Sequence, residues 1–397
     1  MKKHDAITDL LERGVSEVIV RSELEKRLRS GPPIKLYHGI DPTGSRLHIG
    51  HAIPLRKLRA FQELGHEVVM LIGSFTALIG DTSDKNSMRP AITQEEIEEN
   101  FKTYKEQASK ILDFSKVEIR YNGDWLGKLD LKDLLQLANK FTVQQMIERD
   151  MYQKRLKEGK PIGLHEFLYP LMQGYDSVAM DVDLEIGGND QLFNMLAGRT
   201  LQRVLKDREK HVMTLQLLEG TDGRKMSKTY NNVINITDEP NEQYGKIMSI
   251  KDELIIRYFE LCTDLPPEEI RELEATLKAG KNPRDLKMRL GRELVTLYHG
   301  AEAAEQAERE FISVFQKGSK PTEMPEFELT EKEIGIMDLI VELKLASSKS
   351  EARRLVEGGG VSINDEKISD REAAIQLSGE WKTIQVGKRR FAKVKKA

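Results

Sequence analysis

The chain has 397 residues, of which 39% are hydrophobic and 32% charged, and its formal net charge at pH 7 is −3. This length suggests two or three domains, and the composition is typical of a globular protein with an ample core. No apolar run approaches the length of a membrane span. The small net charge excludes a polycation, so a nucleic-acid partner would have to contact local basic patches.

The single cysteine, Cys262, excludes an internal disulfide framework and a cysteine-based zinc site. It lies among apolar residues, and we expect it to fill core space. The first residues lead into an amphipathic helix rather than an apolar signal segment. Both features favour a cytoplasmic protein.

Residues 5–30 predict two short helices, and the Gly-Pro-Pro sequence at 31–33 ends this segment. Ile34, Leu36 and Ile40 then mark a buried strand. The sequence Asp-Pro-Thr-Gly at 41–44 breaks the strand, since proline fixes φ and glycine permits positive φ. Helix-forming residues return from residue 47.

Two histidines start this helix. His48 and His51 are three residues apart, so both imidazoles share one face of the first turn. A helix N-terminus attracts phosphate, and the imidazoles could donate to charge that develops there. Gly50 lets a flat group such as a nucleotide approach the backbone. The alternative is two ordinary helix histidines, and the pair is too short for a metal site.

A helix over residues 54–64 ends at Gly65, and residues 67–73 form a nearly continuous apolar run. Such a run is typical of a parallel strand that is covered on both faces. Strand, helix and strand at this spacing predict a βαβ unit and a doubly wound α/β fold. Ligands of such folds bind at the carboxyl ends of the strands.

The next loop, residues 77–90, is polar and follows that strand. Asp81 could hold an ammonium group, whereas Lys85 and Arg89 could reach phosphate. The alternative is a surface loop with scattered charge. Thr93 is placed to cap a helix that runs to about Leu112, and residues 116–121 predict a third strand.

Residues 130–180 are predicted to be mostly helical. Tyr169, Gln173 and Asp176 are spaced four and three apart, so a helix places them on one face. Three polar groups on an apolar helix are costly to bury without partners. They indicate either a polar contact between helices or the wall of a ligand pocket.

A strand over residues 182–186 is followed by two glycines and by Asp190, which is placed to bind ribose hydroxyls. Residues 211–218 predict the last strand of this region. It leads to a glycine-containing loop that carries Lys225 and Lys228. A Lys-x-x-Lys pair is usually solvated surface, but in a loop it could clamp a polyphosphate leaving group.

After Ile236 the sequence predicts helix after helix over residues 241–315, then a linker at 318–325. Two short helices within 334–357 and a small β region at 361–364 follow. The last eleven residues are markedly basic. With Lys349, Arg353 and Arg354 they predict an RNA-phosphate patch, although basic tails are often only solubilising.

The His48–His51 and Lys225–Lys228 motifs, in this order, resemble the two signatures of class I aminoacyl-tRNA synthetases. Nearly the whole chain resembles the bacterial-type tyrosyl-tRNA synthetases, and residues 345–355 and 360–364 are similar to an S4-type RNA-binding module. The lysine motif ends in Thr229 rather than the family's commoner serine. His38 stands where the family varies and receives no role.

The resemblance implies a Rossmann-like doubly wound parallel sheet in a catalytic domain over residues 1–236. It implies a helical dimerisation insertion at about 125–170, an α-helical anticodon-binding domain over 237–320 and a small α+β S4-like domain over 333–397. The protein would form a homodimer, act on L-tyrosine, ATP and tRNA(Tyr), and not enter membranes.

The resemblance also implies site roles. Tyr37 and Asp176 would bind the substrate's phenolic hydroxyl. Asp81, Tyr169 and Gln173 would hold the substrate's ammonium group, and Gln191 would lie near its carboxylate. The residues that would line the adenosine side are Asp41, Gly50, His51, Gly188 and Asp190. The residues that would surround the departing pyrophosphate are Thr43, His48, Lys85, Arg89, Lys225 and Lys228.

By the same resemblance, the tyrosine carboxylate attacks the α-phosphate of ATP, and the tyrosyl group then passes to the 3′ end of the tRNA. Mg²⁺ is expected with the ATP phosphates rather than in a protein cage. Three rivals remain open. They are a tryptophan enzyme of the same fold, an RNA-binding paralogue without activity, and a nucleotidyltransferase that shares only the histidine turn.

Overall fold

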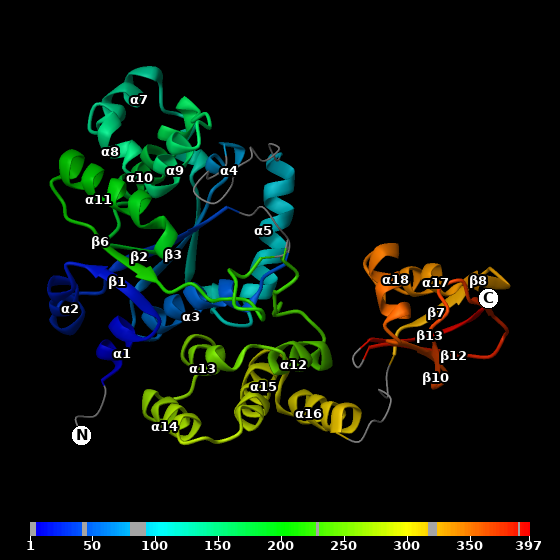
Figure 1. Ribbon diagram of the computed structural model, residues 1–397. Helices are drawn as coiled ribbons and strands as arrows, with labels where there is room; N and C mark the ends of the chain where they lie inside the picture. Colours follow the sequence, from blue (N-terminus) through cyan, green and yellow to red (C-terminus); the bar gives the residue numbers. More distant parts are fainter. Residues whose placement is uncertain (1–4, 42–45, 80–92, 228–229, 317–323, 388–389) are drawn as a thin grey trace. The chain divides into compact units, whose positions relative to one another are not determined.

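The computed structural model describes residues 5–41, 46–79, 93–227, 230–316, 324–387 and 390–397. The chain forms two compact units, Met1–Ala301 and Glu302–Ala397. Figure 1 shows the elements of both units in chain order. No helix in the described ranges is long and apolar enough to cross a membrane.

The first unit is built on a six-stranded sheet with the strand order β1-β6-β5-β2-β3-β4. All neighbours are parallel except β1, which runs antiparallel to β6. The strands are β1 (Val15–Ile19), β2 (Lys35–Ile40), β3 (Glu67–Ile72), β4 (Val117–Tyr121), β5 (Leu184–Gly188) and β6 (His211–Leu215). The predicted doubly wound parallel sheet is therefore confirmed, and its strand order reverses between β2 and β5.

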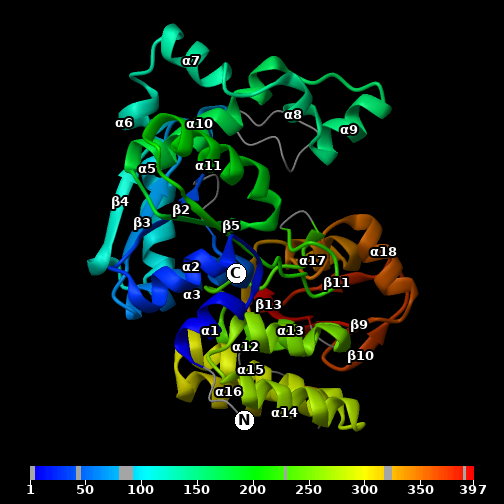
Figure 2. The same ribbon diagram turned by 90° about the vertical axis from the view of Figure 1, so that its left-hand side faces the viewer.

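Helices cover both faces of this sheet, with α10 and α11 on one side and α3 on the other (Figure 1). The first-unit helices are α1 (Ala6–Glu12), α2 (Arg21–Ser30), α3 (Ile49–Glu63), α4 (Thr76–Ile79), α5 (Gln94–Ala108), α6 (Gly123–Leu126), α7 (Leu131–Ala138), α8 (Val143–Ile147), α9 (Asp150–Lys157), α10 (Tyr169–Met180), α11 (Leu192–Lys206), α12 (Pro240–Met248), α13 (Ile255–Cys262), α14 (Pro267–Lys278) and α15 (Pro283–His299). Short 3₁₀ segments are Phe114–Lys116, Leu164–Phe167, Asn189–Gln191 and Asp252–Leu254. Helices α6 to α9 form a separate layer beyond α10 and α11 (Figure 2).

The N-terminal segment corrects one prediction, because residues 5–30 contain a strand between the two helices. Helix α1 ends at Glu12, and Gly14 adopts a φ of +65°, which turns the chain into β1. Strand β1 then pairs with β6, with Val18 opposite Met213. Its pairing partner lies about two hundred residues away, so local periodicity could not indicate it.

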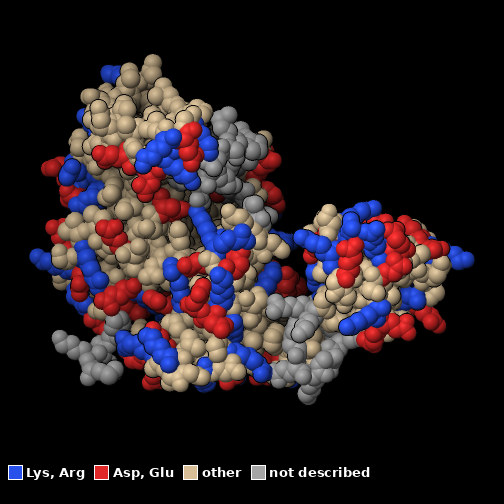
Figure 3. Space-filling view, in the orientation of Figure 1, with Lys and Arg blue, Asp and Glu red and all other residues tan. Residues whose placement is uncertain are grey.

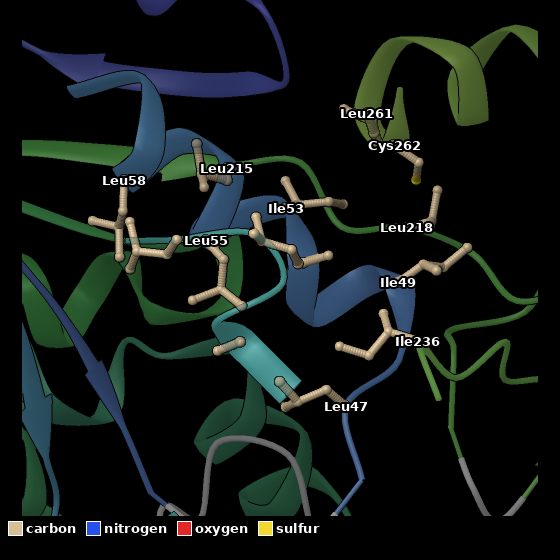
Figure 4. Packing of buried hydrophobic residues seen from close by; sticks show 14 of the residues in the cluster. Leu47, Ile49, Ile53, Leu55, Leu58, Leu215, Leu218, Ile236, Leu261 and Cys262 are labelled. Carbon is tan, nitrogen blue, oxygen red and sulfur yellow. The ribbon is translucent and has the colours of Figure 1, made fainter. Parts of the chain in front are cut away.

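The core of the first unit holds the start of α3 in place. Figure 4 shows Ile49 and Ile53 of α3 in one cluster with Leu215 of β6 and with Leu261 and Cys262 of α13, and it shows Leu47 beside Ile236. Cys262 is buried in this cluster, as the sequence predicts. Helices α12 to α15 belong to the same compact unit as the sheet, and the boundary after residue 236 stays a prediction.

The second unit begins within helix α16 (Ala301–Gln316) and also contains α17 (Ile336–Glu342) and α18 (Lys349–Glu357). A five-stranded sheet has the order β10-β9-β12-β13-β7, and β11 pairs with β8. The strands are β7 (Glu326–Leu329), β8 (Glu333–Gly335), β9 (Val361–Ile363), β10 (Glu366–Ile368), β11 (Ala374–Gln376), β12 (Lys382–Val386) and β13 (Arg390–Lys396). This mixed α+β architecture agrees with the prediction for the C-terminal region.

The basic C-terminal segment is largely a strand rather than a tail. Strand β13 pairs with both β12 and β7. Its cations face acidic partners, with Arg390 2.9 Å from Glu351 and Lys395 2.8 Å from Glu328. Part of the basic charge is therefore neutralised within the unit.

Candidate functional site

A cavity of about 290 Å³ opens at the carboxyl ends of β2 and β5, where the strand order reverses. This is the place where open α/β sheets bind their ligands. Eight predicted site residues line it together: Tyr37, Asp41, Tyr169, Gln173, Asp176, Gly188, Asp190 and Gln191. They come from β2, from α10 and from the turn after β5, so three separate segments meet in one cavity.

The closed end of the cavity carries a phenol and a carboxyl group. Tyr37 is fully buried, and its hydroxyl lies 2.9 Å from Ser177 Oγ. Asp176 is also buried and accepts hydrogen bonds from Trp125 Nε1 at 2.7 Å and Asn122 Nδ2 at 3.3 Å.

Burial raises the pKa of both groups well above their ordinary values, and the charges of Glu185 and Asp176 raise the pKa of Tyr37 further. The Tyr37 hydroxyl therefore keeps its proton at neutral pH. The hydrogen bonds that Asp176 accepts from Trp125 and Asn122 act in the opposite direction on its pKa and favour the ionised carboxylate.

Asp41 is fixed at the end of β2. Tyr169 Oη donates to its Oδ2 at 3.0 Å, and Thr76 Oγ1 donates to its Oδ1 at 3.0 Å. A Cβ at Gly73 would lie 1.9 Å from Asp41 Oδ1, so only glycine leaves room for this carboxylate. The structure thus couples Tyr169 and Asp41, which the sequence assigned to different parts of the site.

Further buried polar groups support the residues that line the cavity, and no pattern in the sequence indicates them. Lys210 forms an ion pair with Glu185, and Gln173 Nε2 donates to Glu185 Oε1 at 3.2 Å. Asn194 Nδ2 donates at 3.0 Å to both Gln173 Oε1 and Gln191 Oε1. Both predicted glutamines are therefore held by neighbours that no sequence motif identifies.

The two histidines lie at the start of α3, as predicted. His48 is the N-cap residue, and its backbone N–H donates to His51 Nδ1 at 3.3 Å. The rings stack with centroids 3.6 Å apart. A Cβ at Gly50 would lie 3.0 Å from His48 Nδ1, so the glycine leaves space beside the ring.

The histidine turn is tied to the chain that follows the lysine loop. Ile49 N–H donates to Ile234 O at 2.9 Å, and Ile236 N–H donates to Leu47 O at 3.0 Å. Backbone hydrogen bonds therefore join the histidine turn to residues 234–236, which follow the lysine loop in the chain.

Asn232 follows the lysine motif, and its side chain forms hydrogen bonds with the loop. Its Oδ1 accepts from Ser227 N–H at 2.8 Å, and its Nδ2 donates to Asp222 Oδ1 at 2.7 Å and Lys225 O at 3.1 Å. Hydrogen bonds from Asn232 and Arg224 hold the pKa of Asp222 far below its usual value.

Lys225 Nζ lies 3.6 Å from Asp190 Oδ2, which brings the loop to the cavity. The remaining predicted site residues lie outside the described ranges: Thr43, Asp81, Lys85, Arg89 and Lys228.

A mostly parallel sheet with a histidine pair at the start of α3 and a lysine loop after β6 defines a class of enzymes. Residues 29–316 match the family model described as "tRNA synthetases class I (W and Y)". Residues 315–394 match the model described as "Tyrosine--tRNA ligase SYY-like C-terminal domain". The chain belongs to the class I tRNA synthetases, and within them to the tyrosyl-tRNA synthetase family.

Individual proteins that are similar to this chain have names of the same family. The tyrosine–tRNA ligase of Thermotoga maritima is 50% identical over 387 residues, covering 97% of this chain and 96% of the relative. That of Mannheimia succiniciproducens is 47% identical and covers 97% of each. A C-terminally truncated mitochondrial tyrosyl-tRNA synthetase of Coccidioides posadasii superposes with a TM-score of 0.61 at 26% identity, over 77% of this chain and 92% of that one.

Proposed function

We propose that this chain is a tyrosine–tRNA ligase. It activates L-tyrosine with ATP to tyrosyl-adenylate and pyrophosphate, and then transfers the tyrosyl group to the 3′ end of tRNA(Tyr). We infer the substrate from the closed end of the cavity, where Tyr37 and Asp176 are among the lining residues. A hydroxyl both donates and accepts, which suits one phenol and one carboxylate. An indole N–H only donates a hydrogen bond, so tryptophan would offer the Tyr37 hydroxyl no acceptor.

The chemistry requires positioning and charge stabilisation rather than a protein nucleophile, because the carboxylate of tyrosine itself attacks the α-phosphate. The N-terminus of α3 with His48 and His51 supplies donors for the phosphates. Lys225, beside Asp190, supplies a cation for the departing pyrophosphate. Mg²⁺ arrives with the ATP phosphates, since it keeps several waters and binds through substrate phosphates.

The remaining roles follow the predicted arrangement. Tyr169, Gln173 and Gln191 face the amino-acid substrate, whereas Asp41 and Asp190 lie toward the nucleotide. Gln173 is held by Glu185 and Asn194, so its orientation is set before the substrate binds. Thr43, Asp81, Lys85, Arg89 and Lys228 keep the roles predicted from the sequence.

We propose that the chain acts as a homodimer through residues 125–170. This segment exposes five large apolar side chains, with exposed fractions from 51% to 78%: Leu131, Leu135, Val143, Leu156 and Leu164. Figure 3 shows few charged side chains over α7 and α8 on the face it presents. Apolar groups exposed together indicate a protein–protein contact.

The dimer is tested by sedimentation of the variant Leu131→Asp/Leu135→Asp, with Leu64→Asp as control. Leu64 is 40% exposed at the end of α3, away from the insertion. We expect monomers from the double variant and dimers from the control. A wild-type monomer at micromolar concentration would contradict the assembly.

The second unit and the helices that precede it would bind tRNA, with residues 237–320 as the anticodon-binding domain and 333–397 as the S4-like domain. A cytoplasmic location fits the single buried cysteine. The function is tested by transfer of labelled tyrosine to tRNA(Tyr). Charging with tyrosine supports the proposal, and charging with tryptophan instead would overturn the substrate.

A further inference from the structure

A fully buried lysine lies beneath the closed end of the cavity. Lys210 directly precedes β6, and its side chain is 0% exposed. Its Nζ donates to Ser177 Oγ at 2.8 Å, forms an ion pair with the Glu185 carboxylate and lies 5.9 Å from the centroid of the Tyr37 ring. Burying an ammonium group is costly unless its partners satisfy it, so this position requires an explanation.

The packing of α10 against α11 makes the space for this ammonium group. A Cβ at Gly198 would lie 2.5 Å from Lys210 Nζ and 2.8 Å from Ser177 Oγ. A Cβ at Gly174 would lie 2.9 Å from the Gly198 backbone nitrogen. Two facing glycines therefore bring the helices close while leaving room for the lysine and the serine hydroxyl.

The chemistry of lysine fixes the direction of the hydrogen bonds. An ammonium group only donates, so Ser177 Oγ accepts from Lys210. The hydroxyl proton of Ser177 must then point elsewhere. Among the described contacts, the other side-chain partner of Ser177 Oγ is Tyr37 Oη at 2.9 Å, which can accept it. Tyr37 is then free to direct its own proton into the cavity.

Glu185 is the competitor for the Tyr37 proton. Glu185 pairs in register with Tyr37 on the neighbouring strand, and both its charge and its capacity to accept a hydrogen bond from the Tyr37 hydroxyl raise the pKa of Tyr37. Lys210 contacts Glu185 Oε2, and Gln173 donates to Oε1. Each carboxylate oxygen therefore already accepts one hydrogen bond, and the ammonium charge of Lys210 offsets that of Glu185. Both effects make Glu185 a weaker acceptor for the Tyr37 proton, so a ligand oxygen in the cavity can compete for it.

We propose that Lys210 is a positioning residue that orients the hydrogen bonds from Lys210 to Ser177 and from Ser177 to Tyr37, so that Tyr37 donates to the phenolic oxygen of the substrate. Asp176 then accepts the phenolic proton. This inference rests on the proposed function. If these hydrogen bonds ran in the opposite direction, Tyr37 and Asp176 would both act as acceptors toward a substrate hydroxyl that has one proton.

The test compares tyrosine and phenylalanine in amino-acid-dependent ATP–pyrophosphate exchange. Phenylalanine has no hydroxyl, so its activation does not depend on the direction of these hydrogen bonds. Lys210→Met should lower kcat/KM for tyrosine by about tenfold and leave that for phenylalanine within about twofold. Ser177→Ala should lower the tyrosine-to-phenylalanine ratio similarly while the Lys210–Glu185 pair remains.

Two further variants separate positioning from general destabilisation. In a Tyr37→Phe background, Lys210→Met should change the ratio no further, because the donor that it orients is already absent. Gln202→Met is the control. Gln202 is fully buried on α11 and donates to Val182 O at 2.8 Å, outside this chain of hydrogen bonds, so its loss should leave the ratio unchanged.

Equal losses for both amino acids in Lys210→Met, or additive effects in the double variant, would overturn the inference. If Lys210→Met does not fold, Ser177→Ala decides, and an unchanged ratio there overturns it as well. These outcomes differ from failure of the proposed function, in which the wild-type protein would show no exchange with tyrosine.

Discussion

Replacement of Asp176 by asparagine tests the substrate pocket most sharply. The carboxylate is 2% exposed and accepts from Trp125 Nε1 at 2.7 Å and from Asn122 Nδ2 at 3.3 Å. Asparagine has nearly the same shape and can still accept from Trp125. Its amide nitrogen, however, would then face Asn122 Nδ2, which is also a donor, and no charged acceptor would remain for the substrate hydroxyl.

The expected loss follows from the worth of a hydrogen bond to a charged group, about 1.5–3 kcal/mol. This corresponds to about a 10- to 150-fold decrease in kcat/KM for tyrosine. Phenylalanine makes no such bond, so its kcat/KM should change little. A site that forms a hydrogen bond with the substrate hydroxyl discriminates against the analogue that lacks it by about 10⁴–10⁵, and tyrosyl-tRNA synthetase with phenylalanine is the best-known example. Asp176→Asn should lower this tyrosine-to-phenylalanine ratio by about the same 10- to 150-fold as it lowers kcat/KM for tyrosine.

The assay is ATP–pyrophosphate exchange at amino-acid concentrations well below KM, with thermal unfolding to show that the variant is folded. A proportional loss for tyrosine and phenylalanine would mean that Asp176 only supports the fold through Trp125 and Asn122. No loss for tyrosine would remove Asp176 from the pocket. Either result would refute the reasoning.

Three other changes should have distinct effects. Asn232→Ala releases the backbone at Ser227, so single-turnover adenylate formation should slow about tenfold or more while tyrosine affinity is retained; an unchanged rate would contradict a role for the loop. Deletion from Pro325 onward should spare pyrophosphate exchange and impair tRNA charging, and intact charging would refute RNA binding by this region. The Glu351 carboxylate accepts hydrogen bonds from Ser347 and Arg390, and these lower the pKa of Glu351 from 4.5 to about 2. The folded state therefore holds the Glu351 carboxylate ionised more strongly than the unfolded state does, and this stabilisation exists above pH 4.5 and is lost as pH falls toward 2. Urea unfolding, followed by tryptophan fluorescence, should show that Glu351→Gln is less stable than the wild type at neutral pH and equally stable in acid. A difference in the free energy of unfolding that persists in acid would contradict this.

Much of the sheet and part of the site could be predicted because their signals are local. The apolar runs of β3 and β6, the histidine turn and the shared face of Tyr169, Gln173 and Asp176 follow from spacing within a few residues. Strand β1 was missed because its five residues acquire their meaning only beside β6.

The supporting residues of the site could not be predicted for the same reason. Lys210, Glu185 and Ser177 come from three elements and form one buried network only after the sheet and helices pack. In the sequence each is an ordinary polar residue. Asn232 likewise acts through the loop that precedes it, and no spacing rule identifies its three contacts.

The most direct test of the central claim is ATP–pyrophosphate exchange by the purified protein with tyrosine, phenylalanine and tryptophan in turn. The site predicts rapid exchange with tyrosine, far weaker exchange with phenylalanine and none with tryptophan. Exchange with tryptophan would contradict the assignment of Tyr37 and Asp176 to a phenolic hydroxyl. No exchange with any of the three, from folded protein that binds tRNA, would contradict the proposed activity itself.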